Sequence, residues 1–404
     1  MSKFKRYERY KDSGIEWIGE IPEHWGVIKL KYVTKLAYGD SLPTENREEE
    51  GEVDVFGSNG KVGTHNVANT LSPVIIVGRK GSYGKVTYSD KECFAIDTTY
   101  YIDNRCTKSN IKWLYHSLMI LELDKNSQDT GVPGLSREYA YNKYVPVPTV
   151  NEQAAIANFL DQKTAEIDDL IADKEKLIEL LQEKRQAIIT EAVTKGLNPN
   201  VRMKDSGIDW IGGIPEHWHV KKIKYLAFLK SGESITSEMI EEQGEYPVYG
   251  GNGLRGYTSS YTHDGNYVLI GRQGALCGNI NYAQGKFWAS EHAVVVTPLG
   301  DVDLIWLGEL LRSMNLNQYS ISAAQPGLSV TTIQNLFIPV PPHEEQRAIS
   351  YFLKQKIADI EEIIQDTRKQ IIKLKEYRQS LISEAITGKI DVREFANISE
   401  VIHQ

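Results

Sequence analysis

Two short glycine-rich stretches hold the residues of this chain whose chemistry best suits contact with a nucleic acid. "VGRKGSYGK" starts at Val77 and "IGRQGALCGN" starts at Ile270, each after a run of strand-forming residues. Glycine permits close backbone approach, arginine and lysine suit guanine edges and phosphates, and glutamine and asparagine suit adenine. A second pair, "VFGSNGKVG" from Val55 and "VYGGNGLRG" from Val248, is typical of hairpin turns and could belong to the same surface.

We therefore expect DNA contacts from these loops, although a solvated surface role is the alternative for each residue alone. The candidates in the first half of the chain are Asn59, Lys61, Arg79, Lys80, Ser82, Tyr83 and Lys85. The candidates in the second half are Asn252, Arg255, Arg272, Gln273 and Asn279. Tyrosines interleave with these residues, and they fit either a recognition surface or packing between strands.

No catalytic or metal-binding pattern accompanies the loops. The sequence has no GxSxG, HExxH, Walker or dinucleotide-binding motif and no NPPY-like tetrapeptide. His24 and His217 recur in "PEHW", where a neighbouring tryptophan favours packing over general-base chemistry. Glu291 and His292 adjoin, but the matching stretch has aspartate and threonine instead. We expect no catalytic residue and no metal site in this chain.

Composition sets the class of protein. A chain of 404 residues with 41% apolar content exceeds one usual core, so at least two domains are expected. Cys93, Cys106 and Cys277 show no CxxC spacing, which argues against a disulfide framework or a zinc site. No apolar run could span a membrane or serve as a signal peptide, so a cytoplasmic location is expected. The net charge of −8 means that any DNA contact must depend on local basic groups.

An internal repeat organises the chain. A shift of 193 residues carries Trp25 to Trp218 within "IPEHW", the "PGLS" at Pro133 to the one at Pro326, and "EQAAIANFL" to "EQRAISYFL". Two copies of about 190 residues are too long for a solenoid repeat and indicate a duplicated domain with its helix. We expect Trp25 and Trp218 to be structural joints that seat each domain against a helix.

Each copy changes character at a proline-rich joint. Residues 26–148 and 219–341 have short strand-like runs separated by glycine, asparagine and serine. After the joints, apolar residues recur at helical spacing and predict helices over about 151–195 and 344–387, the first capped by Asn151. A helix of that length, about 65 Å, needs a partner for its apolar stripe, and the other helix is the obvious one. Antiparallel pairing would set the two globular domains at opposite ends of a rod, related by an approximate twofold axis.

The expected fold class is α+β. Two mixed, strand-rich domains are separated by two long antiparallel coiled-coil helices, with pseudo-twofold internal duplication. The expected segments are a first globular domain (1–150), a first long helix (151–198), a second globular domain (199–342), a second long helix (343–390) and a C-terminal tail (391–404).

The order of these motifs, repeated twice, resembles the specificity subunit of type I restriction-modification systems over nearly the whole chain. The resemblance implies that each globular domain is a target recognition domain for one half of a bipartite, asymmetric site in double-stranded DNA. It implies that the helices set the gap and dock two methyltransferase (modification) subunits, and that restriction subunits add translocation and cleavage. This chain would be non-catalytic and bind no cofactor, with S-adenosylmethionine, ATP and magnesium on the partner subunits, and no membrane would be involved. The residues expected at partner or helix docking are Gln153, Ile156, Leu160, Gln346, Ile349 and Leu353.

Three alternatives remain open on the sequence alone. A related type II system, in which the partner fuses nuclease and methyltransferase, would use the same kind of subunit. A duplicated scaffold would bind proteins and not DNA. An enzyme with an unrecognised site would be active when purified alone.

Overall fold

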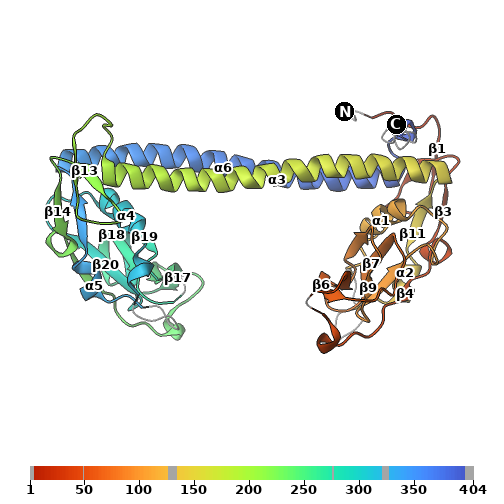
Figure 1. The fold of residues 1–404 in the computed structure, drawn as a ribbon, viewed down its shortest axis with the longest axis horizontal. Coiled ribbons are helices and arrows are strands. Elements are labelled where there is room, and N and C mark those ends of the chain that lie inside the picture. The colour runs from red at the N-terminus through yellow and green to blue at the C-terminus, as the bar shows by residue number, and fades with distance from the viewer. Residues whose placement is uncertain (1–3, 49, 126–133, 275–276, 321–326, 396–404) are drawn as a thin grey trace. The chain divides into compact units, whose positions relative to one another are not determined.

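A computed structural model describes residues 4–48, 50–125, 134–274, 277–320 and 327–395 (Figure 1). The chain divides into two compact units, residues 1–174 with 369–404, and residues 175–368. Each unit combines one strand-rich domain with parts of both long helices. The "PGLS" prolines, Pro133 and Pro326, lie outside the described residues.

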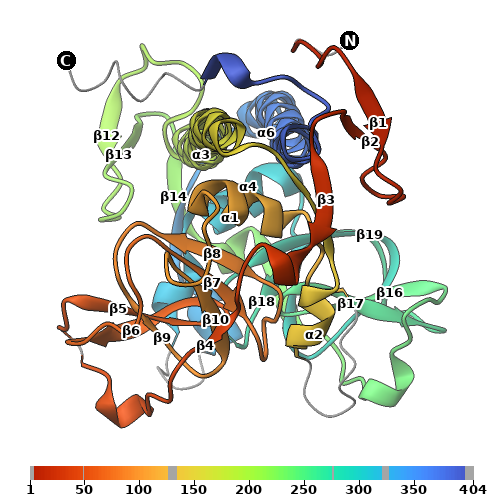
Figure 2. The same ribbon diagram turned by 90° about the vertical axis from the view of Figure 1, so that its right-hand side faces the viewer.

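The first domain occupies the first unit up to Val147. Its elements are β1 (Tyr10–Asp12), β2 (Glu20–Pro22), β3 (Gly26–Lys29), β4 (Ala37–Tyr38), β5 (Val53–Gly57), β6 (Gly60–His65), β7 (Val74–Gly78), β8 (Val86–Ser89), β9 (Phe94–Ala95), β10 (Thr99–Ile102), α1 (Ile111–Met119), α2 (Arg137–Tyr141) and β11 (Tyr144–Val147). Strands β4, β10, β7 and β8 form one sheet in that order, β6, β5 and β9 form a second, and β3 pairs with β11. Helix α1 lies against β7 and β8 (Figure 2), so the apolar run of β7 is fully buried.

The second domain repeats this plan in the second unit. Its elements are β12 (Met203–Asp205), β13 (Gly213–Pro215), β14 (His219–Lys222), β15 (Ala227–Ser231), β16 (Tyr246–Gly250), β17 (Gly253–Thr258), β18 (His263–Gly271), β19 (Ile280–Ala289), β20 (Ala293–Pro298), α4 (Leu304–Ser313), α5 (Val330–Gln334) and β21 (Phe337–Val340). Here six strands form one sheet, in the order β15, β20, β18, β19, β16, β17. The single strand β19 pairs with both β18 and β16, whereas in the first domain β8 and β9 divide these two roles.

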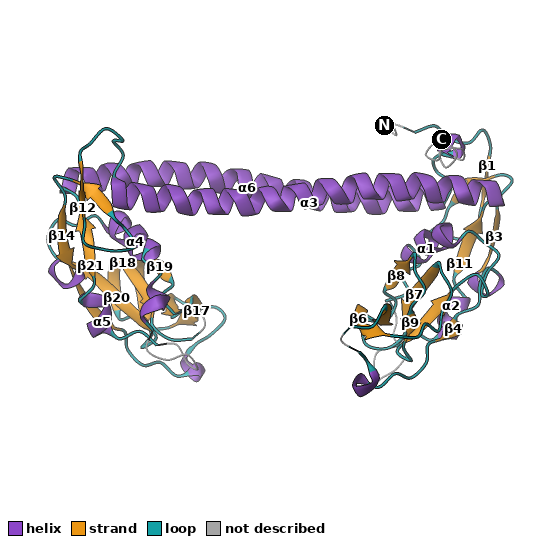
Figure 3. Ribbon diagram, viewed as in Figure 1, coloured by secondary structure: helices purple, strands orange, loops and turns teal. Residues whose placement is uncertain are grey.

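Two long helices complete the architecture: α3 (Val150–Lys195) and α6 (His343–Ile386) (Figure 3). Within the first unit they run antiparallel, because Asp168 of α3 pairs with Arg378 at 2.9 Å while Lys174, further along α3, donates to Gln370 at 2.7 Å. Within the second unit the end of α3 shares a core with the start of α6. The expected fold class is thus confirmed: two mixed, strand-rich domains with two long helices.

The cap assigned to Asn151 was wrong. Helix α3 is capped by Thr149, whose hydroxyl accepts from the Glu152 backbone N–H (3.4 Å) while Glu152 Oε2 accepts from the Thr149 N–H (3.1 Å). This reciprocal pair is a capping box, which satisfies two backbone donors at once. In the second copy Pro342 stands at the matching position and offers no side-chain cap.

The two ends of the described chain meet in the first unit. The Tyr10 hydroxyl donates to the carbonyl of Gly388, just beyond α6 (3.0 Å), and the Asp391 N–H donates to the Lys5 carbonyl (2.8 Å). The Arg393 guanidinium lies 5.0 Å from the centre of the Tyr7 ring. Among the described residues, no helix is long and apolar enough to cross a bilayer.

Candidate nucleic-acid interface

The two glycine-rich loops of the first domain lie against each other. Lys85, in the loop after β7, donates from Nζ to the backbone carbonyl (2.7 Å) and the side-chain oxygen (3.0 Å) of Asn59, in the β5–β6 turn. A Cβ on Gly78 would collide with the Ser82 carbonyl and lie 3.0 Å from that of Ser58, so only glycine permits this approach. The structure thus brings most of the first set of candidates into one loop cluster.

Arg79 directly follows β7 and begins the loop that holds Lys85. Its backbone N–H donates to the Thr98 carbonyl (2.8 Å), and its own carbonyl accepts from the Leu135 N–H (2.8 Å). Its guanidinium lies 5.2 Å from the centre of the half-exposed Tyr38 ring, a cation–π arrangement. Lys80 and Ser82 are exposed beside it and Tyr83 is half-buried.

The second domain builds a matching cluster with different side chains. Asn279 lies within 3.5 Å of the side chain of Asn252, which is in the β16–β17 turn. A Cβ on Gly271 would collide with the Gly251 carbonyl, as Gly78 does with its neighbours. Arg272 donates from Nη1 to the Ser231 hydroxyl (2.8 Å), and Gln273 is exposed.

Two candidates lie on the hairpins and interact locally. Lys61 of β6 forms an ion pair with Asp54 of β5 at 2.5 Å, so a nearby carboxylate offsets its charge. Arg255 is an exposed residue of β17, and its aliphatic stem covers Gly250.

Sequence reasoning missed Tyr38 and Arg137 in this region. The Arg137 guanidinium lies 4.8 Å from the centre of the Tyr38 ring, so this ring interacts with both Arg137 and Arg79. Tyr38 also lies 5.1 Å from the ring of Tyr100, its partner in the sheet. The only signal in the sequence was that Arg137 directly follows the repeated "PGLS".

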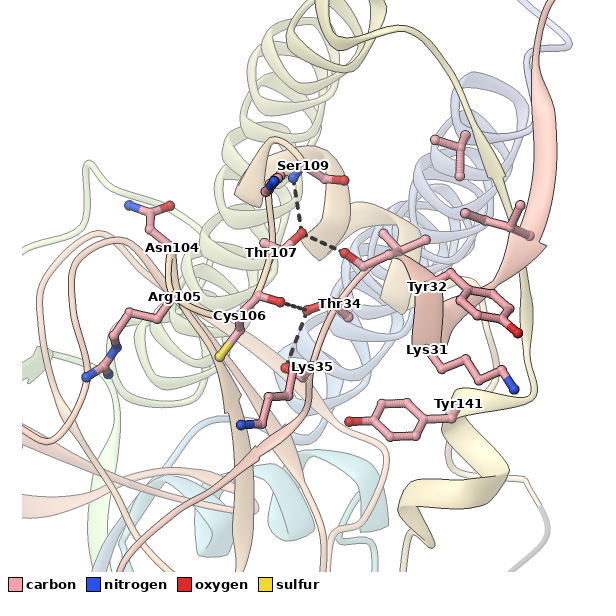
Figure 4. A pocket seen from close by; sticks show the side chains of 14 residues that line it. Lys31, Tyr32, Thr34, Lys35, Asn104, Arg105, Cys106, Thr107, Ser109 and Tyr141 are labelled. Atoms are coloured by element: carbon pink, nitrogen blue, oxygen red, sulfur yellow. Dashed lines mark hydrogen bonds between the residues drawn. The ribbon is translucent and has the colours of Figure 1, made fainter.

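A shallow basic hollow of about 610 Å³ lies on the same domain (Figure 4). No carboxylate lines it, and its cationic side chains are Lys31, Lys35, Arg105 and Lys108. The Thr107 hydroxyl, which donates to the Val33 carbonyl (2.8 Å), joins the two segments that form the hollow. Since Asp103, a buried carboxylate, pairs with Arg105, the lysines supply most of the free charge, which suits phosphate.

A buried carboxylate ties the "PEHW" segment of the first domain to α3. Glu152 Oε1 accepts from Trp25 Nε1 (3.1 Å) and contacts His24 Nε2 (2.8 Å), which must donate because a carboxylate only accepts. Burial alone would raise the pKa of Glu152, but hydrogen bonds from Thr149, His24 and Trp25 outweigh it and hold the pKa below its ordinary value. We call Trp25, His24 and Glu152 the first joint.

The second joint has the same chemistry at a shift of 193 residues. Glu345 of α6 accepts from Trp218 Nε1 (2.9 Å) and from His217 Nε2 (2.6 Å). Its side chain is 40% exposed, against 7% for the side chain of Glu152, so the second joint is more exposed to solvent than the first. Trp25 and Trp218 are both fully buried, each at the entrance to its domain.

The end of the opposite helix also reaches each joint. A Cβ on Gly196, just beyond α3, would lie 3.1 Å from the Trp218 ring, and a Cβ on Gly388, just beyond α6, would lie 3.0 Å from the Trp25 ring. Each tryptophan therefore contacts the start of one long helix and the end of the other.

The residues expected at partner or helix docking lie near the starts of α3 and α6. All six are buried within this chain: Gln153, Ile156, Leu160, Gln346, Ile349 and Leu353. Each glutamine accepts from a backbone N–H at the start of a short helix, Gln153 from Asn110 (2.9 Å) and Gln346 from Asp303 (3.0 Å). These side chains attach the long helices to their own domains, so they offer no surface to a partner.

The helix part of the docking expectation has a counterpart in the second unit. Ile349 and Leu353 share a buried cluster with Ile189 and Val193 of α3, and with Trp218. The apolar faces there serve the helix pair and the second domain together.

The described residues provide no obvious metal site. No group of three or more histidine, cysteine, aspartate or glutamate side chains in that part of the chain could hold an ion. Cys93 and Cys277 are buried, Cys106 is half-buried, and all three are free thiols.

A family profile described as the type I restriction modification DNA specificity domain matches the chain twice, at residues 22–180 and 215–373. An Escherichia coli protein, the type I restriction enzyme EcoprrI specificity subunit, is 46% identical over 129 residues, which are 31% of this chain and 32% of that protein. This chain therefore matches about a third of that relative's length. The MjaVIII specificity subunit of Methanocaldococcus jannaschii is 25% identical over 311 residues, 70% of each chain.

Solved structures share the fold. A chain from work on complex assembly and conformational transition of the type I R-M system has a TM-score of 0.62 and 15% identity, covering 91% of this chain and 98% of that one. The HsdS subunit of Thermoanaerobacter tengcongensis has a TM-score of 0.51 and 16% identity, with coverage of 92% and 98%. By the doubled profile match, which takes in well over half of its residues, this chain belongs to the type I restriction modification DNA specificity family.

Proposed function

We propose that this chain is the non-catalytic DNA-specificity subunit of a type I restriction-modification complex, and that each domain reads one half of a bipartite, asymmetric DNA site. The observation that carries this proposal is that two domains with the same fold and equivalent joints have two different loop clusters. The joints recur with the same glutamate, histidine and tryptophan, while Lys80 is replaced by Gln273 at the matching position. A shared frame with different donors suits two different half-sequences.

The helices α3 and α6 would set the gap between the half-sites. A helix of 46 residues extends about 69 Å at 1.5 Å per residue, and its continuity makes it a rigid spacer. Two sites held at fixed separation read two short sequences and ignore the bases between them, as spaced half-sites do for other DNA-binding dimers.

Two modification subunits would bind this chain, joined by restriction subunits in the full complex. S-adenosylmethionine, ATP and magnesium would act on those partners and not here. The partners would also supply phosphate contacts, which lets a chain with a net charge of −8 act in a DNA complex. Adenine methylation would further require the target base to leave the duplex, so the complex must accept distorted DNA.

Methylome sequencing of cells that express the complete system tests the proposal. We expect one bipartite methylated motif that disappears when this chain is deleted. Exchanging residues 26–148 for another recognition domain should change one half of the motif, and deleting a heptad-length piece of both helices should shorten the gap without changing either half. A motif that is independent of this chain would refute the proposal and favour a protein-binding scaffold. A motif with a partner that fuses nuclease and methyltransferase would indicate the related type II system.

A further inference from the structure

Arg79 and Arg272 occupy equivalent places, at a shift of 193 residues, directly after β7 and β18. The backbone of each is fixed on both sides. The Arg272 N–H donates to the His292 carbonyl (2.9 Å) and its carbonyl accepts from Leu328 (2.9 Å), as Arg79 does with Thr98 and Leu135. The two domains therefore fix the backbone of both arginines in the same way.

Neither arginine is satisfied by its own domain. The Nε of each is buried without a hydrogen-bond partner, and within the described residues no carboxylate pairs with either guanidinium. Among the described side chains, the Arg79 guanidinium contacts the face of the Tyr38 ring. The Arg272 guanidinium donates one hydrogen bond, to the Ser231 hydroxyl. Since no carboxylate of the described residues neutralises either guanidinium, the charge of each is available to an anionic ligand such as a phosphate.

What surrounds the two arginines differs between the domains. Tyr38 corresponds to Ser231, and Arg137 corresponds to Val330. A residue that both domains keep cannot distinguish two different half-sequences unless the same base stands in both. A residue that only one domain has can do so.

We propose that Arg79 and Arg272 are equivalent phosphate anchors, one in each domain. The discrimination of the first half-site then depends on residues that the second domain lacks, above all Arg137. This division of roles rests on the proposed function. The planar guanidinium fork matches a phosphate, and fixing its backbone reduces the ordering needed on binding. Phosphate contacts set position and orientation and are independent of sequence, whereas base contacts give specificity.

The experiment measures binding of the complete complex to two labelled duplexes, one with the methylome-derived site and one without it, over a series of salt concentrations. Arg79→Ala and Arg272→Ala should each weaken binding to both duplexes by a similar factor. Each should lower the slope of log affinity against log salt by about 0.9, the value for one phosphate. Both half-sequences of the methylated motif should stay unchanged. Arg79→Lys keeps the charge and should keep the slope, which separates loss of the anchor from loss of the fold.

Arg137→Val, which installs the residue of the second domain, is the matched variant. It should alter the preferred bases in one half of the motif only. A changed half-sequence in Arg79→Ala or Arg272→Ala would overturn the proposal, because it would make that arginine a base reader. An unchanged salt slope in both alanine variants would also overturn it. If the wild-type complex gave no motif dependent on this chain, the proposed function would fail first and this inference with it.

Discussion

Replacing Glu152 with alanine should loosen the first joint strongly, and the equivalent change at Glu345 provides the comparison. Glu152 accepts from Trp25, His24 and both donors of Thr149, and its side chain is only 7% exposed. A hydrogen bond to a charged group contributes about 1.5–3 kcal/mol, and loss of a helix cap costs about 0.5–2 kcal/mol. Since such contributions are not additive, we expect Glu152→Ala to cost about 3 kcal/mol of local stability.

Glu345→Ala should cost about 1 kcal/mol, because within the described residues the Glu345 side chain makes only its two joint bonds, is 40% exposed and has no capping threonine. Hydrogen-exchange mass spectrometry on the full chain measures both effects. Peptides around Trp25 and the start of α3 should exchange about 100-fold faster in Glu152→Ala, and those around Trp218 about fivefold faster in Glu345→Ala. Equal effects in the two variants, or a larger one at Glu345, would refute the argument that burial and capping set the difference.

Three further predictions concern the first unit. Because the Glu152 pKa lies below its ordinary value of 4.5 in the folded chain, its stabilisation should be complete above about pH 4.5 and lost as the pH falls through the folded value, so urea unfolding of wild type and Glu152→Gln should converge in acid. Gly388→Ala should lower the melting temperature more than Gly14→Ala: both glycines have φ of +71°, but a Cβ on Gly388 would lie 2.5 Å from Pro22 Cδ, and one on Gly14 would meet nothing within 4 Å. Burial raises the pKa of the Cys93 thiol to about 11, so mass-spectrometric thiol labelling at neutral pH should modify half-buried Cys106 well before Cys93.

The long helices were predictable because their signal is local. Apolar spacing placed the first helix from Asn151, and the structure begins it at Val150 and ends it at Lys195, as expected. The cap was misassigned although the sequence held the answer, since Thr149 followed three residues later by Glu152 is the capping-box signature.

The joints could be predicted only in part. A repeated tryptophan indicated packing at Trp25 and Trp218, but the acceptor for each indole lies 127 residues further along the chain. No local pattern reports a contact at that separation. The repeat did hold a usable signal, because Glu152 and Glu345 recur at the same shift as the two tryptophans.

The loop clusters were the least predictable part of the candidate interface. Arg79 and Lys85 stand out in a glycine-rich stretch, but the approach of Tyr38 depends on β10 lying between β4 and β7 in the sheet. Strand order is a property of the whole domain. The residues expected at partner or helix docking show a related limit: apolar spacing shows that Ile156 and Leu160 are on a packed face, and it does not show whether that face packs on a partner or on their own domain.

The contacts between the two ends of the described chain have a consequence for synthesis. The second unit is one continuous stretch, residues 175–368, so all of it can fold as soon as it has left the ribosome. The first unit includes residues from 369 onward, and its strand β1 is held by Gly388 and its Tyr7 by Arg393. The domain that is synthesised first is therefore completed last. Until Gly388 has been synthesised, one side of the Trp25 indole lacks its packing partner.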